Sequence, residues 1–331
     1  MDIGVIGVGR IGAFHAATLA DLPSVDRVVI ADIDAERTAT LAAERGYEEA
    51  SSVDDLLGKV GAVVIASSTD THAQFIHASV DAGLTTFCEK PISLDLESTR
   101  GVVEHVRRSG ATLQMGFQRR FDPGFRAASE LVLSGGLGNL YLVRMAGHDP
   151  APPHESYIPQ SGGIFRDFSV HDFDALRFVT GREVEEVYAD GSVIGFPVFA
   201  SYDDVDTAVA TVRLRGGALG VLSVNRHDPR GYDIRMELIG SEDAIAVGWD
   251  ERMPLRSVEP GMPPPPAEAW ANFQQRFEPA YRAELSAFLE VAAGRRKNPC
   301  TPEDALEALR VAVACDLSRA EHRPVRLEEV S

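Results

Sequence analysis

Three glycines near the N-terminus constrain the fold of this chain more than any other feature. The stretch GVIGVGRIG places Gly7, Gly9 and Gly12 in a G-x-G-x-x-G spacing, directly after an apolar run and at the start of a helix-like segment. In such a turn the first glycine allows the sharp bend, the second lets backbone approach a pyrophosphate, and the third lets helix and strand pack closely. The pattern therefore predicts a phosphate-binding turn that opens a helix N-terminus toward an anion.

An acidic residue follows at the spacing that a dinucleotide site requires. Asp32 ends the next apolar run, twenty residues after Gly12, where a carboxylate can bind a ribose diol. A carboxylate there repels a 2′-phosphate, and Ile33 offers no cation, so NAD is favoured as cofactor; Arg37, a turn later, keeps NADP as the alternative. We expect the cofactor to contact the glycine turn and the acidic strand end: Gly7, Val8, Gly9, Arg10, Ile11, Gly12, Asp32 and Ile33.

The first third of the chain alternates short runs rich in Val, Ile and Thr with helix-like segments. Strand after helix after strand implies a doubly wound parallel sheet, which makes 1–118 an α/β NAD-binding Rossmann domain. The helix-like segments end near glycines that can cap them. The expected strands are 2–7, 27–32, 61–67, 84–89 and 112–117, and the clearest helices are 34–46 and 94–110.

The pattern changes after about residue 118. Residues 233–240 alternate apolar and charged side chains, and 206–225 has the form of two strands joined at Gly216–Gly217. Two helices follow, one with an apolar stripe on Leu285, Phe288, Leu289 and Ala292 and one that begins at Thr301 and Pro302. We therefore predict a second, α+β domain over 119–331. The proline-rich stretch 259–266 is expected to be an irregular loop, either an oligomer arm or a lid.

Charge and cysteine content exclude several classes of partner. Lys plus Arg number 32 against 50 Asp plus Glu, a net charge of −18, which repels nucleic acid and anionic lipid. The chain has no apolar run of about 18 residues and no basic leader at its start. Cys88, Cys300 and Cys315 lack metal-type spacing, so we expect reduced thiols in a cytoplasmic protein without a bound metal.

Two further stretches carry chemistry. Glu89 and Lys90 follow a strand at the sheet edge where ligands of open α/β folds bind. In SGGIFRDFSVHDFD, Asp167 and His171 are four residues apart within an apolar segment, so on a helical turn they would face the same way. These two residues could have a purely structural role, in which Asp167 caps a helix and His171 is packed in the interior. Because the chain also has a cofactor site, we interpret the pair as catalytic.

Together these motifs resemble the glucose–fructose oxidoreductase/inositol dehydrogenase (Gfo/Idh/MocA) family over the whole chain. The resemblance rests on the glycine turn, Glu89-Lys90-Pro91, Gly162-Gly163 with Asp167 and His171, and the AYRAEL stretch near the C-terminus. It implies that the C-terminal domain, 119–331, serves substrate binding and oligomerisation and is built on a large, open, mostly antiparallel sheet. It also implies a dimer or tetramer, and Lys90, Asp167 and His171 as catalytic residues. Ser67, Thr69, His72, Glu89 and Lys90 resemble the family's nicotinamide-nucleotide contacts.

Within that family, GFQRRFDPGF, DPAPP, SGGIFRDFSVHDFD and GYDIR are most similar to the inositol 2-dehydrogenases. This implies oxidation of a ring secondary alcohol of a cyclitol, myo-inositol to 2-keto-myo-inositol, in inositol catabolism. Arginine often precedes DPAPP in inositol-type sequences, whereas this chain has His148 there, which keeps a different sugar substrate open. The remaining alternatives are an NAD-using glycosidase and a non-catalytic dinucleotide-binding regulator.

The reaction implied by the resemblance needs a hydride acceptor and a base. Free imidazole titrates near pH ~6.5 and free lysine near ~10.4, so His171 is better suited to accept the hydroxyl proton. Asp167 would orient the imidazole, and Lys90 would stabilise the alkoxide, although these roles of Lys90 and His171 could be exchanged. A polyol also needs hydrogen-bonding side chains, for which we propose Lys90, Arg119, His148, Asp149, Asp167, His171 and Tyr232. Arg119 could instead form a structural salt bridge, and Tyr232 could be a half-buried sheet residue.

Overall fold

The computed structural model describes residues 1–264 and 268–330, and these residues form two compact units. The first unit contains 1–118 and 279–306, and the second contains the described residues of 119–278 and 307–330. The sequence analysis assigns 279–306 to its second domain. The functions predicted for the two domains stay predictions. Residues 265 and 266 of the proline-rich stretch lie outside the described residues.

The first unit contains a parallel sheet of six strands in the order β3-β2-β1-β4-β5-β6, which confirms the doubly wound α/β fold. Strand order reverses between β1 and β4, and ligands of such sheets bind at the carboxyl ends of the strands beside this point. The two-residue strand β3 was not predicted because it lacks an apolar run. The strands are β1 (Asp2–Ile6), β2 (Arg27–Ala31), β3 (Glu48–Glu49), β4 (Ala62–Ile65), β5 (Thr85–Glu89) and β6 (Leu113–Gly116).

Helices α1 (Arg10–Ala20), α2 (Ala35–Arg45), α3 (Val53–Leu57), α4 (Thr69–Asp81) and α5 (Leu96–Ser109) connect these strands. The two predicted helices are present with the expected C-caps, because Gly46 (φ 73°) and Gly110 (φ 68°) adopt the left-handed conformation. At the other end of α2, the Asp34 side chain caps the helix by accepting from the Arg37 N–H.

The core of the first unit explains why a C-terminal segment belongs to it. Ile3, Val5, Val64 and Phe87 are fully buried in the sheet, and they share one cluster with Leu285, Phe288 and Leu289. The last three belong to the predicted apolar stripe of helix α9 (Phe273–Ala292), and the fourth residue of that stripe, Ala292, packs against the same cluster. Helix periodicity alone predicts that a stripe is buried, but it does not say which sheet covers it.

The second unit contains a sheet of seven strands in the order β12-β11-β7-β10-β9-β8-β13. Among the described strand pairs of this second sheet, only β7–β10 is parallel, so the predicted mostly antiparallel open sheet is confirmed. Gly216 and Gly217, both at φ 89°, join β9 to β10 as predicted. The strands are β7 (Leu140–His148), β8 (Val184–Ser192), β9 (Thr207–Leu214), β10 (Leu219–Asn225), β11 (Asp233–Gly240), β12 (Ala244–Val247) and β13 (Val325–Arg326).

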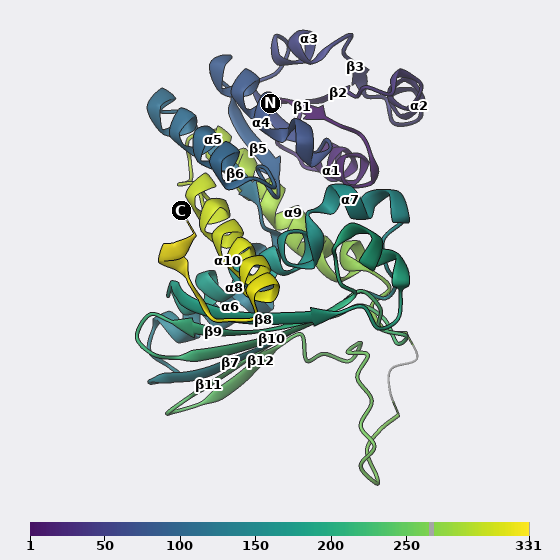
Figure 1. The fold of residues 1–331 in the computed structure, drawn as a ribbon. Coiled ribbons are helices and arrows are strands. Elements are labelled where there is room, and N and C mark those ends of the chain that lie inside the picture. Colours follow the sequence, from purple (N-terminus) through teal and green to yellow (C-terminus); the bar gives the residue numbers. More distant parts are fainter. Residues whose placement is uncertain (265–267, 331) are drawn as a thin grey trace. The chain divides into compact units, whose positions relative to one another are not determined.

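Helices α6 (Pro123–Leu133) and α8 (Val170–Thr180) lie over one face of this sheet (Figure 1). Strand residues on the opposite face are exposed, and several of them are large and apolar: Tyr141, Tyr188, Val209, Leu219 and Val221. The unit also contains α7 (Ile158–Ser161), a π-helix at Phe165–Ser169, and short 3-10 turns at Gln118–Phe121, Glu155–Tyr157, Pro197–Tyr202 and Leu327–Glu329.

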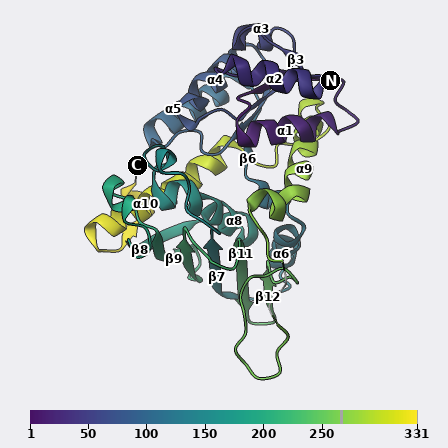
Figure 2. The same ribbon diagram turned by 90° about the vertical axis from the view of Figure 1, so that its right-hand side faces the viewer.

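Helix α10 (Pro302–Glu321) begins as its sequence predicts. The Thr301 hydroxyl accepts from the Asp304 N–H, and the Asp304 carboxylate accepts from the Thr301 N–H. After β12 the chain leaves the sheet as an extended loop, traced through residues 248–264 (Figures 1 and 2).

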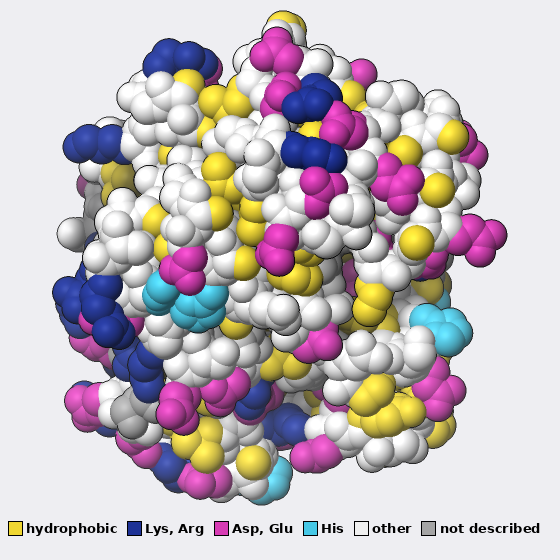
Figure 3. Space-filling view, turned by 90° about the horizontal axis from the view of Figure 1, so that it is seen from above, with side chains coloured by type: hydrophobic (Ala, Val, Ile, Leu, Met, Phe, Trp, Pro, Cys, Tyr) yellow, Lys and Arg dark blue, Asp and Glu magenta, His cyan; other side chains and the backbone are white. Residues whose placement is uncertain are grey.

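The described helices include none that is both long and apolar enough to cross a bilayer. Acidic side chains are scattered over the face seen in Figure 3, in keeping with the net charge of −18.

Candidate active site

The turn between β1 and α1 contains three glycines. Contacts within the protein leave no space for a side chain at two of them, whereas the third has open space around it. A Cβ on Gly7, which has φ +87°, would lie 2.5 Å from the backbone N of Ser67, and a Cβ on Gly12 would collide with the carbonyl oxygen of Gly7. A Cβ on Gly9 would meet no described heavy atom within 4 Å. Open space at Gly9, beside the first turn of α1, fits the close approach of a pyrophosphate.

Asp32 is held by this same turn. Its Oδ2 accepts from the Val8 N–H at 2.6 Å and its Oδ1 from the Asp34 N–H at 2.9 Å. The Asp32 side chain is only 7% exposed, and Arg37 Nη1 lies 3.7 Å from its Oδ1. Arg37 also pairs with Asp34 at 2.9 Å, so its charge is shared between two carboxylates. The carboxylates of Asp32 and Asp34 thus offset the charge of Arg37, which makes it less available to a 2′-phosphate and favours NAD over NADP.

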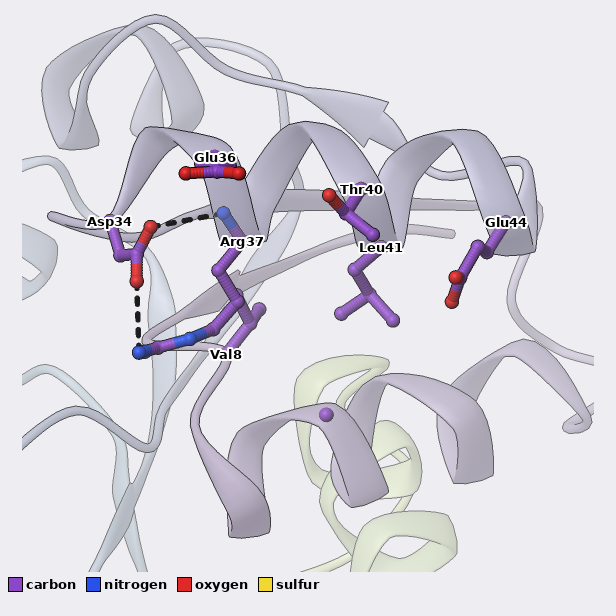
Figure 4. Close-up of a pocket in the computed structure, with 8 residues that line it drawn as sticks. Val8, Asp34, Glu36, Arg37, Thr40, Leu41 and Glu44 are labelled. Carbon is purple, nitrogen blue, oxygen red and sulfur yellow. Dashed lines mark hydrogen bonds and ion pairs between the residues drawn. The ribbon is translucent and has the colours of Figure 1, made fainter.

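A shallow hollow lies between the glycine turn, α1 and α2 (Figure 4). Three of its lining side chains are acidic and one is basic. Its lining residues are Val8, Ala13, Asp34, Glu36, Arg37, Thr40, Leu41 and Glu44. Of the other predicted contacts in this region, Arg10 and Ile33 are exposed and Ile11 is half-buried. The hollow adjoins the turn residue Val8, whose N–H donates to Asp32.

Lys90 lies directly after β5, and buried histidines contact the residues on both sides of it. His15 Nε2 lies 2.6 Å from Glu89 Oε1, and His72 Nδ1 lies 2.7 Å from the carbonyl oxygen of Pro91. His72 Nε2 lies 3.1 Å from the carbonyl oxygen of Ser67. Burial lowers the pKa of His72, so this imidazole is neutral at pH 7. Of the other predicted contacts, Ser67 and Thr69 are both half-buried.

In the second unit, Asp167 lies in a π-helix where the sequence predicts an ordinary helical turn. A π-helix inserts an extra residue, so the α-helical spacing rule does not describe how Asp167 and His171 face. Oδ1 of Asp167 accepts from the Tyr157 hydroxyl at 2.9 Å, and Oδ2 accepts from Arg226 Nη1 at 3.0 Å. His171 is half-buried in the first turn of α8.

Arg226 is a central charge of this region. Its side chain is 3% exposed, and Nη1 also lies 3.6 Å from Oδ2 of Asp149. Burial lowers the pKa of this guanidinium, but the carboxylates of Asp167, Asp149 and Asp204 outweigh that effect, so the pKa is raised overall. The structure thus brings two predicted residues, Asp149 and Asp167, around one arginine that the sequence analysis missed.

Arg119 and Tyr232 are more buried than their predicted substrate contacts suggest. Arg119 is 3% exposed and pairs with Asp172, as the structural alternative expected. Burial raises the pKa of the Tyr232 phenol well above its usual range, so this side chain is not a proton acceptor near neutral pH. Tyr232 also hydrogen-bonds Arg119.

His148 ends β7 between two carboxylates. Its Nδ1 lies 3.6 Å from Oδ2 of Asp233 and 3.8 Å from Oδ2 of Asp228. These three side chains form the one group within the described residues whose ligand atoms are close enough for a metal ion. Both oxygens of Asp233 already accept hydrogen bonds from Arg235, whose charge opposes a cation there.

The sequence analysis missed Tyr157, Asp172 and Arg226. Asp172 directly follows His171, but adjacency on a helix does not indicate a partner, and its guanidinium partner Arg119 is 53 residues away. Arg226 follows a strand end in SVNRHDP, as many loop arginines do. Only its burial would have distinguished it, and burial depends on the tertiary fold.

The comparisons with known proteins agree with this architecture. Residues 1–117 match an oxidoreductase family with an NAD-binding Rossmann fold, and residues 125–246 match the GFO/IDH/MocA C-terminal domain. The fold and the glycine turn thus define an NAD-binding oxidoreductase. More specifically, the chain belongs to the GFO/IDH/MocA family, as its resemblance predicted.

Relatives match over nearly the full length. The chain is 38% identical to the myo-inositol dehydrogenase Hyg17 of Streptomyces leeuwenhoekii, over 96% of this chain and 97% of the relative. It is 37% identical to the myo-inositol 2-dehydrogenase of Thermotoga maritima, over 100% and 99%. The scyllo-inositol dehydrogenase of Lactobacillus casei, solved with bound NAD(H) and scyllo-inositol, has a TM-score of 0.90 at 28% identity and covers 99% of both chains.

Proposed function

We propose that this protein is an NAD-dependent inositol 2-dehydrogenase, which oxidises a ring secondary alcohol of a cyclitol, myo-inositol to 2-keto-myo-inositol. The observation that carries the proposal is the full-length similarity to relatives named as myo-inositol dehydrogenases. A structural neighbour solved with scyllo-inositol and NAD(H) supports the same class of substrate.

The first unit offers the residues that would hold NAD. The open space at Gly9 and the first turn of α1 fit the pyrophosphate, and the Asp32 carboxylate fits a ribose diol. When bound, the nicotinamide supplies a hydride acceptor. Lys90, after β5, is the residue of this unit that we assign to the reacting end of the cofactor, together with Glu89, Ser67, Thr69 and His72.

In the proposed mechanism His171 accepts the proton of the substrate hydroxyl. Asp167 is held by Tyr157 and Arg226, and the positive charge of Arg226 favours its carboxylate form. An ionised carboxylate beside the site stabilises the imidazolium that forms on His171. Lys90, kept charged, stabilises the alkoxide oxygen before the hydride leaves. This division of roles requires Lys90 and His171 to reach the same carbinol.

His148 and Asp149 are the substrate contacts that the geometry supports best, because both are partly exposed at the end of β7. Arg119 and Tyr232 are buried, so we assign them to the support of this region through Asp172 and not to direct contact. His148 lies between two carboxylates, and this arrangement favours a substrate that presents hydroxyl groups over one that presents a carboxylate.

A substrate panel tests the proposed function. The purified protein would be given myo-, scyllo- and chiro-inositol, glucose, galactose and 1,6-anhydro sugars, each with NAD and with NADP, while NADH absorbance is followed. We expect turnover of an inositol with NAD. Turnover of an aldose alone would indicate a sugar dehydrogenase instead. Cleavage of a glycoside without net formation of NADH would indicate an NAD-using glycosidase. Binding of the coenzyme without any turnover would indicate a dinucleotide-binding regulator.

We further propose a cytoplasmic homo-oligomer, a dimer or a tetramer, that acts in inositol catabolism. The face of the seven-stranded sheet opposite α6 and α8 exposes Tyr141, Val209, Leu219 and Val221 by 40–56%. Apolar side chains gathered on a sheet face are typical of protein interfaces. Light scattering after gel filtration measures the mass, and Val209→Glu with Val221→Glu should lower it to that of the 35.8 kDa chain.

The free, buried cysteines Cys88, Cys300 and Cys315 accord with a reducing compartment.

A further inference from the structure

His15 is a buried histidine for which the coenzyme site as described has no use. It lies on α1, the helix that opens at the glycine turn, and it is 0% exposed. Two aromatic rings pack against it at steep angles, Phe87 from β5 and Tyr281 from α9, each with its centroid 5.7 Å away. A buried imidazole needs hydrogen-bond partners, and His15 has one of them at Nε2.

That partner is the residue before Lys90. His15 Nε2 lies 2.6 Å from Oε1 of Glu89, the last residue of β5, and Oε2 of Glu89 accepts from the Lys90 N–H at 3.3 Å. The two oxygens of one carboxylate therefore connect α1 to the backbone of Lys90. Gly116 at the end of β6 leaves the space for this carboxylate, because a Cβ there would lie 3.1 Å from Oε2.

The surroundings of His15 also indicate which of its two ring nitrogens carries the proton. Nδ1 of His15 is buried and meets no hydrogen-bond partner among the described residues. A proton on Nδ1 would be a buried donor without an acceptor, whereas a bare lone pair there costs less. The geometry therefore places a proton on Nε2, which donates to Oε1 of Glu89, and none on Nδ1.

We propose that His15 is a positioning residue for Lys90. Through Glu89 it fixes the turn after β5 relative to α1. Lys90 then keeps a constant position relative to the glycine turn that would bind the coenzyme phosphates. His72 acts on the other side, since its ring contacts the carbonyl of Pro91 and belongs to α4. This inference rests on the proposed role of Lys90.

The test compares a variant that loses the Nε2 donor with one that keeps a donor. His15→Leu should bind NAD with unchanged affinity and leave KM for the inositol nearly unchanged, but lower kcat about 10- to 100-fold, because small displacements of a reacting group are this costly. His15→Gln, whose side-chain amide can still donate to Glu89, should recover most of the loss. Leu19→Val, which loses packing on the same helix without touching Glu89, should lower stability and keep kcat.

A double-variant cycle separates positioning from general damage. If His15 acts through Lys90, His15→Leu should cause no further loss of kcat in a chain that already carries Lys90→Met. An equal loss in both backgrounds, or full kcat in a folded His15→Leu protein, would overturn the proposal. Wild-type kcat in Lys90→Met alone would instead refute the role of Lys90, so the two failures are distinguishable.

The tautomer provides a readout that needs neither coenzyme nor turnover. A long-range proton–nitrogen spectrum of the coenzyme-free protein, with the His15 signal assigned by its absence in His15→Gln, should show the proton on Nε2. A proton on Nδ1 would contradict the proposal, even if His15→Leu does not fold.

Discussion

Arg226 donates a hydrogen bond through Nη1 to Oδ2 of Asp167, 3.0 Å away, from a position where its side chain is 3% exposed. Because the Tyr157 hydroxyl donates to Oδ1, both oxygens of Asp167 are engaged. A carboxylate bound in this way is suited to hold a fixed negative charge and poorly suited to carry a proton. In the proposed reaction Asp167 therefore carries the fixed charge, and the role of proton acceptor is assigned to His171.

Arg226→Met tests the importance of this buried pair. Removal of the buried guanidinium leaves the carboxylates of Asp167, Asp149 and Asp204 without their shared cation, and the first two are only partly buried. We therefore expect the free energy of unfolding to fall by about 1–3 kcal/mol, measured by urea denaturation. Adding Asp167→Asn to Arg226→Met should restore part of it. Arg144→Met is the matched control, because Arg144 is 55% exposed beside Glu237 and its loss should cost less than about 1 kcal/mol. Equal effects of the two arginine substitutions would contradict the prediction.

His171→Ala tests the proposed base. The variant should keep its affinity for NAD, measured by fluorescence titration, and lose about 10²–10⁴-fold in turnover. His105→Ala, on α5, serves as the control and should keep normal turnover. A near-normal rate in His171→Ala would remove this residue from the mechanism.

Asp32 and Ile33 should control the choice of coenzyme. Asp32→Asn keeps an oxygen to accept from the Val8 N–H but removes the charge, and Ile33, which is fully exposed, can become Arg without loss of packing. The double variant should lower kcat/KM for NAD and raise it for NADP, each by about 10-fold or more. NAD loses the Asp32 carboxylate that binds its ribose diol. The 2′-phosphate of NADP is no longer repelled by that carboxylate and gains an ion pair with the new arginine. Steady-state kinetics with both coenzymes measure the ratio. An unchanged ratio would show that the choice is made elsewhere.

Asp206 should make stability depend on acid pH. Burial alone would raise its pKa, but the N–H groups of Ile194, Phe196 and Gly195 donate to the carboxylate, and the pKa is lowered overall. A lowered pKa means that the folded state favours the ionised form, so the stabilisation is complete above the ordinary value of 3.8 and is lost as the pH falls below it. Asp206→Asn should therefore cost about 1–3 kcal/mol near pH 7 and less as the pH falls below 3.8. A difference from wild type that stays constant down to pH 3 would contradict this assignment.

Local patterns predicted most elements correctly because they depend on near neighbours. The glycine spacing, the apolar runs of the first sheet and the Gly216–Gly217 turn each follow from the backbone preferences of a few adjacent residues. Like the two-residue strand β3, the Asp167 segment was not predicted from such a pattern. Its sequence is compatible with an α-helical turn, and the π-helix there adds a residue for which hydrophobic periodicity gives no signal.

Groups that are far apart in the sequence could not be paired in advance. Asp167 and Arg226 are 59 residues apart, and His15 and Glu89 are 74 apart. No periodicity links such positions, because each pairing depends on how strands and helices pack after they form. The same reason explains why Pro279–Leu306 belongs to the first unit although it lies far along the chain.

The amino-acid sequence by itself determined the nucleotide-binding turn, the fold class of both domains and the family. Each of these follows from motifs and periodicities among residues that are close together in the sequence. The tertiary structure alone decided which polar side chains face one another: the ion pairs Arg226–Asp167 and Arg119–Asp172, and the hydrogen bond between His15 and Glu89. A buried charge is stable only beside its partner, and burial is a property of the packed chain.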